Sequence, residues 1–338
     1  MKIIASVNPN SFSENKVRKI ILAGADIIRY NLGYQITDEN IKNISEAQKI
    51  IDSLNSSTKI LVDLPSNKTR LGSFDETQIE VKEGEELIFK SASNSTSCKN
   101  FIPVVAEKLG GDVTVNQMIT IANGEVSVEV IEIIDNGTIK AIALNNGTIY
   151  SMCSFNLMVN EDKYLKAIEE EIKKIQTVKV DYLAIPYINN KIQEKIYKII
   201  TENGFKEKIM LKIGNKEAVD EIDAICKETI FDAILIDRGK LGVNTPFEQI
   251  GITQKLITQK VRENKKQVFI STQILESTID NFIPHKSEIL DLTNMVLDGI
   301  NGIILCKETD VGNRPAYTIS VAKKIINAVK QNRYKINK

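Results

Sequence analysis

The sequence predicts an α/β fold: a (β/α)8 barrel with a small β domain inserted after the third barrel strand. Three observations lead to this prediction. Short apolar runs rich in β-branched residues alternate with amphipathic segments, this alternation occurs eight times, and helical periodicity is absent from about 71 to 155. Strands of a parallel sheet buried on both faces read as near-continuous apolar runs. Eight strand–helix pairs are the number that closes a barrel.

The predicted strands are Lys2–Val7, Ile27–Leu32, Lys59–Leu64, Tyr182–Tyr187, Lys208–Ile213, Ala233–Asp237, Gln267–Thr272 and Gly302–Cys306. Nearly every run is followed by apolar residues at helical spacing. The predicted helices include Glu14–Ala23, Asp38–Ser53, Glu161–Gln176, Asn190–Asn203, Glu217–Lys227, Phe247–Glu263 and Ala316–Lys330. Strand followed by helix, repeated in this way, is the TIM-barrel architecture.

The interval between the third and fourth predicted strands has a different pattern. Polar and apolar residues alternate in Gln78–Val81, Glu125–Ile131 and Thr138–Leu144, and turn signals such as Asn136-Gly137 separate the runs. We therefore expect a small, β-barrel-like domain over 71–156, with the barrel formed by 1–70 and 157–338. A domain inserted at the carboxyl end of a barrel strand is expected to act as a lid over the active site.

Composition excludes several classes of protein. The 338 residues carry 44 basic and 44 acidic side chains, whereas general nucleic-acid-binding proteins usually carry a basic excess. No apolar run reaches the ~18–20 residues of a membrane span. The cysteines are far apart and form no CxxC pair, which favours reduced thiols in a cytoplasmic protein; they are Cys98, Cys153, Cys226 and Cys306.

Candidate site residues lie at the carboxyl ends of the predicted strands, where barrel enzymes place their active sites. These polar residues are Ser6, Asn8, Arg29, Asn31, Asp63, Tyr187, Lys212, Asp237, Arg238, Lys240, Ser271, Thr272 and Glu308. Arg29, Lys212 and Arg238 are expected to converge as cations, with Lys240 just beyond. A charge at a strand end is costly unless it is paired or used, so these cations are candidates for a functional site.

Several segments that contain these residues resemble motifs of the pyruvate kinase family, in the same order and at similar spacing. They are Arg29–Gly33, Asp63–Arg70, Leu211–Asn215, Asp237–Val243 and Ser271–Ser277. The resemblance covers nearly the whole chain, including the β domain after the third strand, and it includes no counterpart of the family's C-terminal regulatory domain. It implies phosphoryl transfer from phosphoenolpyruvate to ADP, with a divalent metal and usually potassium.

The resemblance also implies roles for single residues. Lys212 matches the lysine that stabilises charge on the transferring phosphoryl group, and Thr272 matches a hydroxyl implicated in protonating the enolate. Arg29 and Arg70 match arginines that contact phosphate. The segment around Gly239 matches the segment that binds the substrate carboxylate. Asn31 and Asp63 match two potassium ligands.

Other positions depart from the family. Gly214 and Lys240 stand where the family has the two carboxylates that hold the divalent metal. Magnesium prefers oxygen ligands and an ammonium group repels it, so we expect no magnesium. Lys68 falls where potassium-dependent members have a glutamate, and potassium-independent members resemble this chain in placing a lysine there. We therefore expect two ammonium groups to replace two metals.

The nucleotide side also differs from the family, since Asn8–Ser11 replaces a Gly-Pro-Ala-Ser loop and Tyr34 replaces a histidine. Three interpretations follow. The first is a repurposed protein that binds a small carboxylate or phosphate anion for metal-independent enolate or phosphate chemistry. In it Lys212 stabilises charge, Thr272 or Asp237 moves a proton, and the anion is held by Arg29, Arg70, Arg238, Gly239 and Lys240. The second is a non-catalytic binding or regulatory protein, and the third is a genuine pyruvate kinase. The sequence leaves the oligomeric state open, including a homo-oligomer.

Overall fold

The computed structural model describes residues 1–338 except 9–10, 33–36, 65–67, 77, 96–99, 123, 159–160 and 337–338, and the side chains of 68, 158, 244 and 333–336. The chain divides into two compact units. The barrel unit consists of Met1–Ser66 and Ala167–Lys338, and the insert unit consists of Asn67–Lys166.

The barrel unit contains a closed barrel of eight strands in the order β1-β19-β18-β17-β16-β15-β3-β2, all paired in parallel. The strands are β1 (Lys2–Ser6), β2 (Ile27–Asn31), β3 (Lys59–Asp63), β15 (Tyr182–Pro186), β16 (Lys208–Ile213), β17 (Ala233–Asp237), β18 (Gln267–Ser271) and β19 (Gly302–Leu305). This confirms the predicted (β/α)8 architecture.

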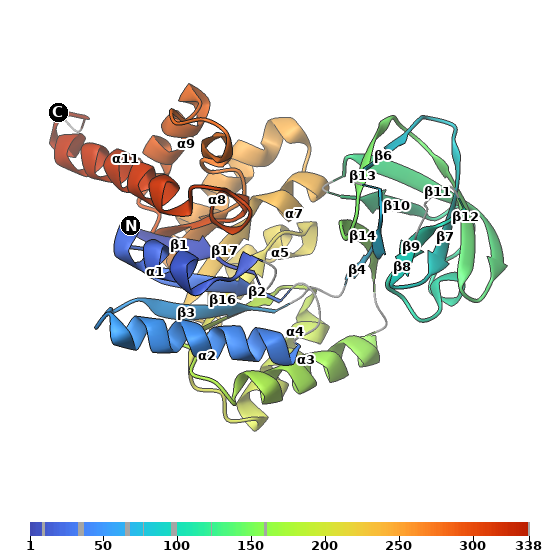
Figure 1. Ribbon diagram of the computed structural model, residues 1–338, viewed down its shortest axis with the longest axis horizontal. Coiled ribbons are helices and arrows are strands. Elements are labelled where there is room, and N and C mark those ends of the chain that lie inside the picture. Colours follow the sequence, from blue (N-terminus) through green and yellow to red (C-terminus); the bar gives the residue numbers. More distant parts are fainter. Residues whose placement is uncertain are drawn as a thin grey trace. The chain divides into compact units, whose positions relative to one another are not determined.

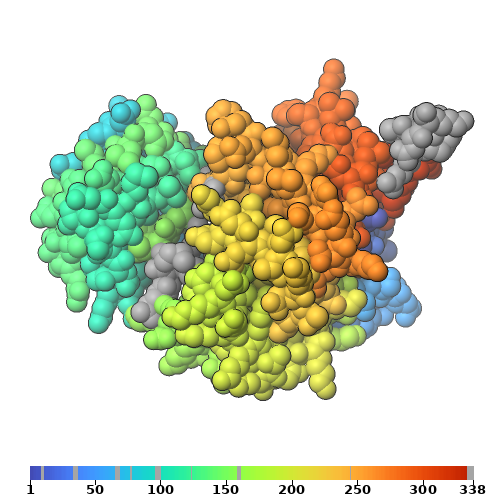
Figure 2. All heavy atoms as spheres, turned by 180° about the vertical axis from the view of Figure 1, so that it is seen from behind, coloured from blue at the N-terminus to red at the C-terminus, as the bar shows by residue number. Residues whose placement is uncertain are grey.

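Helices cover the outside of these strands, as α1, α2 and α11 show in Figure 1. They are α1 (Glu14–Ala23), α2 (Asp38–Ser53), α3 (Glu161–Ile175), α4 (Asn190–Glu202), α5 (Lys216–Asp220), α6 (Ile222–Ile225), α7 (Arg238–Asn244), α8 (Ile250–Glu263), α9 (Lys286–Leu297), α10 (Lys307–Asp310) and α11 (Pro315–Ile336). Local signals fix their ends. Ser13 caps α1 by accepting from the Lys16 amide, and Gly24 ends it at a φ of 89°. Figure 2 shows the molecule from the opposite side, where yellow and orange segments of the chain lie at the surface of the barrel unit.

The bounds of three predicted helices need correction. The predicted helix Glu217–Lys227 is divided into α5 and α6 at Glu221, which has a φ of −96° and a ψ of 7°. The predicted Phe247–Glu263 begins with the 3-10 turn η3 (Phe247–Gln249) before α8. Helix α11 extends to Ile336, beyond the predicted Lys330.

Helix α7 is not among the helices that the sequence predicted. Its seven residues include two glycines, which are poor helix formers, so periodicity gives almost no signal. The helix forms because Asp237 caps it at the end of β17, accepting a hydrogen bond from the Lys240 amide. Helix α7 therefore begins where the barrel strand ends, in the region of the candidate site.

The insert unit is built on a seven-stranded sheet in the order β4-β14-β10-β11-β12-β7-β9, with two small two-stranded sheets. The Asn136-Gly137 turn joins β11 to β12, pairing Asp135 with Thr138, as the sequence predicted. The core of the insert unit is apolar, and in it the ring of Phe89 packs against that of Phe155, with the ring centroids 5.1 Å apart. The strands are β4 (Lys68–Arg70), β5 (Ser73–Phe74), β6 (Gln78–Val81), β7 (Glu86–Ser91), β8 (Asn94–Ser95), β9 (Ile102–Val104), β10 (Met118–Ile121), β11 (Val126–Asp135), β12 (Thr138–Ala143), β13 (Gly147–Tyr150) and β14 (Ser154–Met158); the 3-10 turn η2 is Leu109–Gly111.

Candidate functional site

The carboxylate of Asp63, at the end of β3, joins two cations from other strands. Arg29 of β2 donates its Nε to Asp63 Oδ2 at 2.8 Å, and its Nη2 lies 2.7 Å from the same oxygen. Lys212 of β16 donates its Nζ to Oδ1 and also to the carbonyl oxygen of Leu64 at 2.6 Å. Asp63 is only 1% exposed and Lys212 only 7%. These charge-assisted bonds satisfy the buried carboxylate on both oxygens.

The electrostatics of this group follow from burial and pairing. Burial alone would raise the pKa of Asp63, but Lys212 and Arg29 outweigh it and hold that pKa below its ordinary value. Burial also opposes the charged form of Arg29, and the charge of Asp63 more than offsets it, so the pKa of Arg29 rises. Asp63 and Arg29 are therefore both charged. Together with the ammonium group of Lys212, their formal charges sum to one positive charge at the mouth of the barrel.

Arg29 is fixed by two further contacts. Its Nη1 donates to Ser6 Oγ at 2.9 Å and lies 3.9 Å from Cys306 Sγ. Burial raises the pKa of the Cys306 thiol to about 11, although Arg29 acts in the opposite direction. A thiol with this pKa stays protonated at neutral pH, so Cys306 is a weak nucleophile beside the cations.

The amino end of α7 forms a second part of the site. Asp237 caps the helix, and its Oδ2 lies 3.9 Å from Lys240 Nζ. The stem of Lys240 lies against Gly214, where a Cβ would come within 2.7 Å of Lys240 Cβ. This separation is shorter than side chains tolerate, so Gly214 is the residue that lets the first turn of α7 approach the end of β16.

The loop after β18 has an unusual backbone. Thr272 and Gln273 have φ values of 80° and 52°, and a positive φ is rare for a β-branched residue. Gly239 lies against Thr272, since a Cβ at Gly239 would be 3.4 Å from Thr272 Oγ1. Arg238, predicted as an anion ligand, donates from Nε and Nη2 to the carbonyl oxygen of Thr272, at 3.0 and 2.7 Å.

Two acidic residues of α10, which follows β19, bind neighbouring loops. Glu308, which is buried, accepts from the amides of Ile274 and Leu275 at 3.2 and 3.3 Å, and burial raises its pKa. Asp310 accepts from the Asn8 amide at 2.9 Å and from Ser11 Oγ. Sequence reasoning missed the contacts of Asp310, because they depend on how two loops meet rather than on any motif.

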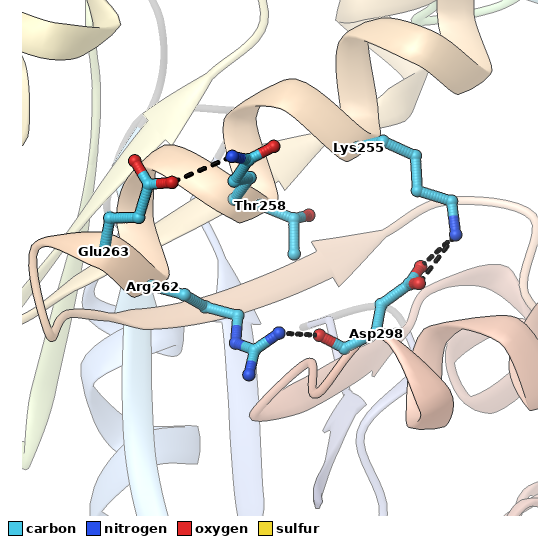
Figure 3. Close-up of a pocket in the computed structure, with 6 residues that line it drawn as sticks. Lys255, Thr258, Arg262, Glu263 and Asp298 are labelled. Carbon is cyan, nitrogen blue, oxygen red and sulfur yellow. Dashed lines mark hydrogen bonds and ion pairs between the residues drawn. The ribbon is translucent and has the colours of Figure 1, made fainter. Parts of the chain in front are cut away.

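Two further predicted residues, Arg70 and Asn31, each lie at the end of a strand. Arg70 belongs to the insert unit, where its Nη1 donates to the carbonyl oxygen of Met152 at 3.4 Å. Asn31 ends β2 in register with Asp63. The side chain of Lys68, and all of Gly33 and Tyr34, lie outside the described residues. The hollow shown in Figure 3, about 450 Å³, lies on the outside of the barrel unit between α8 and the end of α9, and none of the residues that line it is a predicted site residue.

Comparison with known proteins identifies the family. Residues 1–319 match the model of the pyruvate kinase barrel domain. The chain belongs to the pyruvate kinase family. It is 28% identical to pyruvate kinase of Thermotoga maritima over 333 residues, which cover 96% of this chain and 70% of that protein. It is 30% identical over 334 residues to that of Buchnera aphidicola subsp. Schizaphis graminum (95% and 68%), and 26% identical over 335 residues to that of Mycobacterium tuberculosis H37Rv (98% and 70%).

Family membership accounts for the position of the site. The charged group of Arg29, Asp63 and Lys212 and the start of α7 both lie at the carboxyl ends of barrel strands, where enzymes of this architecture bind their substrates. Among the described residues, no helix of this pyruvate kinase relative is long and apolar enough to span a membrane.

Proposed function

We propose that the mouth of the barrel binds a small carboxylate- or phosphate-bearing anion without a divalent metal. The observation that carries this proposal is the packing of Lys240 on Gly214. By resemblance to the family, both metal carboxylates would lie here, and the chain instead has an ammonium group and a hydrogen atom. The carboxylate of Asp237 lies beside this position, but it already caps α7, and its Oδ2 lies 3.9 Å from Lys240 Nζ. This donor set does not fit magnesium, which requires several oxygen ligands.

The potassium position supports the same proposal. Both carboxylate oxygens of Asp63, the match to a family potassium ligand, accept from protein cations, Oδ1 from Lys212 and Oδ2 from Arg29. A potassium ion there would compete with two buried, hydrogen-bonded positive charges. We therefore propose that protein cations take the place of metal ions in this chain.

The charge of the site favours a small ligand. Arg29 and Lys212 against Asp63 leave one positive charge, and Lys240 is offset by Asp237. The charge of the barrel unit therefore matches one anion of low charge, such as a 2-oxo acid, better than two polyanionic substrates bound together. Phosphoryl transfer between polyanions depends on metal ions to neutralise the oxygens, and this supports a repurposed protein over a genuine pyruvate kinase.

The proposed chemistry is the stabilisation of an enolate or phosphate oxygen by Lys212. For an enolate, the proton leaves or joins the carbon next to the carbonyl group, and the negative charge develops on the carbonyl oxygen. Thr272 or Asp237 would carry that proton, and the amides around Gly239 would hold the carboxylate. A small-molecule anion is the only partner that this proposal needs. The cytoplasmic location and a homo-oligomer remain parts of the same proposal.

Calorimetry with oxalate in excess EDTA tests the proposal. We expect the purified chain to bind one oxalate, and we expect Lys240→Ala to weaken binding at least about tenfold, since it removes a cation and leaves Asp237 in place. Lys260→Ala is the matched control, because Lys260 pairs with Asp223 on the outer surface. Absence of binding, or binding that appears only after magnesium is added, would contradict the proposal.

A second measurement separates the three interpretations. Exchange of the methyl protons of pyruvate in heavy water, followed by NMR in EDTA, is expected if the chain stabilises an enolate. Oxalate binding without exchange supports the non-catalytic alternative. Magnesium-dependent formation of pyruvate from phosphoenolpyruvate and ADP would instead establish a genuine pyruvate kinase.

A further inference from the structure

The loop after β18 holds two consecutive residues in a conformation that side chains disfavour. Thr272 and Gln273 both have positive φ, and neither is glycine. Such residues persist only where their surroundings hold them, and they concentrate at functional sites. The contacts that hold this loop therefore decide where the Thr272 hydroxyl lies.

Arg238 supplies most of these contacts. Its Nε and Nη2 donate to the carbonyl oxygen of Thr272, and Nη2 also donates to that of Gln273 at 2.9 Å. Its Nη1 donates to Asp291 Oδ2 of α9 at 2.7 Å, so the guanidinium plane is fixed from behind. A planar guanidinium that binds two successive carbonyl groups and a carboxylate is well suited to fix a backbone turn.

The surroundings of Thr272 complete the arrangement. A Cβ at Gly239 would approach Thr272 Cγ2 at 3.3 Å and Oγ1 at 3.4 Å, so Thr272 packs on the backbone of α7 one residue after Arg238. Beyond the turn, Glu308 accepts from the amides of Ile274 and Leu275. The loop is thus held by Arg238 at its start and by Glu308 at its end.

We propose that Arg238 is a positioning residue, which with Asp291 holds the Thr272 hydroxyl in place at the mouth of the barrel. The proposal rests on the function proposed above, in which Thr272 faces the bound anion. It replaces the sequence-based expectation that Arg238 binds the anion directly. The Asp291–Arg238 pair acts through the backbone of Thr272 and Gln273, and its removal is expected to release the loop.

Arg262 provides a matched control on the same barrel. Its Nη1 donates to the backbone carbonyl oxygen of Asp298 at 2.6 Å (Figure 3). Its guanidinium also lies against Gly299, whose φ is 79°. Arg238→Met and Arg262→Met therefore each remove a guanidinium that binds the carbonyl group of a turn. The two differ in that only Arg238 contacts the loop of the candidate site.

The test combines hydrogen exchange, followed by mass spectrometry over 271–276, with calorimetry of oxalate in EDTA. For Arg238→Met we expect exchange in this segment to quicken about tenfold or more and oxalate binding to weaken by a similar factor, because hydrogen bonds to a charged group are the strong ones. Asp291→Asn, which keeps Arg238, is expected to quicken exchange and weaken oxalate binding as well, each by a smaller factor than Arg238→Met. Arg262→Met is expected to change neither.

Two results would overturn the proposal. If Arg238→Met weakens oxalate binding while exchange over 271–276 stays unchanged, Arg238 is a direct ligand of the anion. If neither quantity changes, the loop is held without Arg238. Should the unmodified chain fail to bind oxalate, the proposed function fails, and the exchange measurement still decides whether Arg238 and Asp291 hold the loop. Should Arg238→Met not fold, Asp291→Asn gives the same decision.

Discussion

Replacement of Asp63 by alanine is expected to lower the free energy of unfolding by about 3–5 kcal/mol at neutral pH. Asp63 is the carboxylate that Arg29 and Lys212 share, and its loss leaves two buried cations beside each other without that counter-charge. Urea unfolding of the two proteins measures the difference. Asp223→Ala is the control, because it removes a carboxylate that pairs with Lys260 at the surface, and we expect little change. A similarly small effect at Asp63 would show that the buried charges are not coupled.

The same carboxylate predicts a direction for the pH dependence. Its pKa in the folded chain lies below its ordinary value, so its contribution to stability is complete above the unfolded pKa of about 3.9 and is lost as pH falls through the lower folded value. The stability gap between the unmodified chain and Asp63→Asn should therefore stay constant from pH 7 to 5 and narrow under stronger acid. Urea unfolding at several pH values measures it, and a gap that widens on acidification contradicts the assignment.

The second large effect concerns Gly214. Gly214→Ala is expected to lower the free energy of unfolding by about 1–3 kcal/mol, because the new methyl group would lie within 2.7 Å of Lys240 Cβ and would force α7 away from β16. In a Lys240→Gly background that contact is absent, so most of the cost should disappear. Urea unfolding of the two single variants and the double variant gives the coupling between the positions.

Gly251→Ala serves as the control for this cycle, because a Cβ at Gly251 of α8 meets open space. Alanine favours a helix over glycine, so this substitution is expected to be neutral or stabilising. Equal costs for Gly214→Ala with lysine and with glycine at position 240 would show that the two residues are independent. The proposed exchange of metal carboxylates for an ammonium group would then lose its steric support.

The sequence was sufficient to predict the barrel because its strands carry a strong local signal. Every predicted barrel strand begins at the observed residue, and the ends differ by at most one, as in Lys59–Leu64 against β3. Helix α7 escaped prediction because its formation depends on Asp237 as a cap and on packing against β18, while its own glycines disfavour a helix.

Side-chain partners were harder to predict than positions. The order of the strands places Arg29, Asp63 and Lys212 at one end of the barrel, but β3 and β16 are not neighbours, and periodicity does not show that Lys212 reaches across β15 to Asp63. Arg238 shows the same difficulty. Its place at the end of β17 suggested a cation facing the ligand, whereas its guanidinium binds the neighbouring backbone.

The interruption of the barrel by the insert unit has a consequence for folding kinetics. Strand β3 pairs with β15 through Leu61 and Tyr182, and β1 pairs with β19 through Lys2 and Gly302. Two of the eight strand pairings of the barrel, here called seams, therefore join distant parts of the chain. Pairings of large sequence separation slow folding, because the entropy of closing the loop is lost before the contacts form. An insert unit that folds first would shorten the chain that the β3–β15 seam must close, whereas no such shortcut exists for β1 and β19. We therefore expect closure of the first strand onto the last to be the slow step of folding.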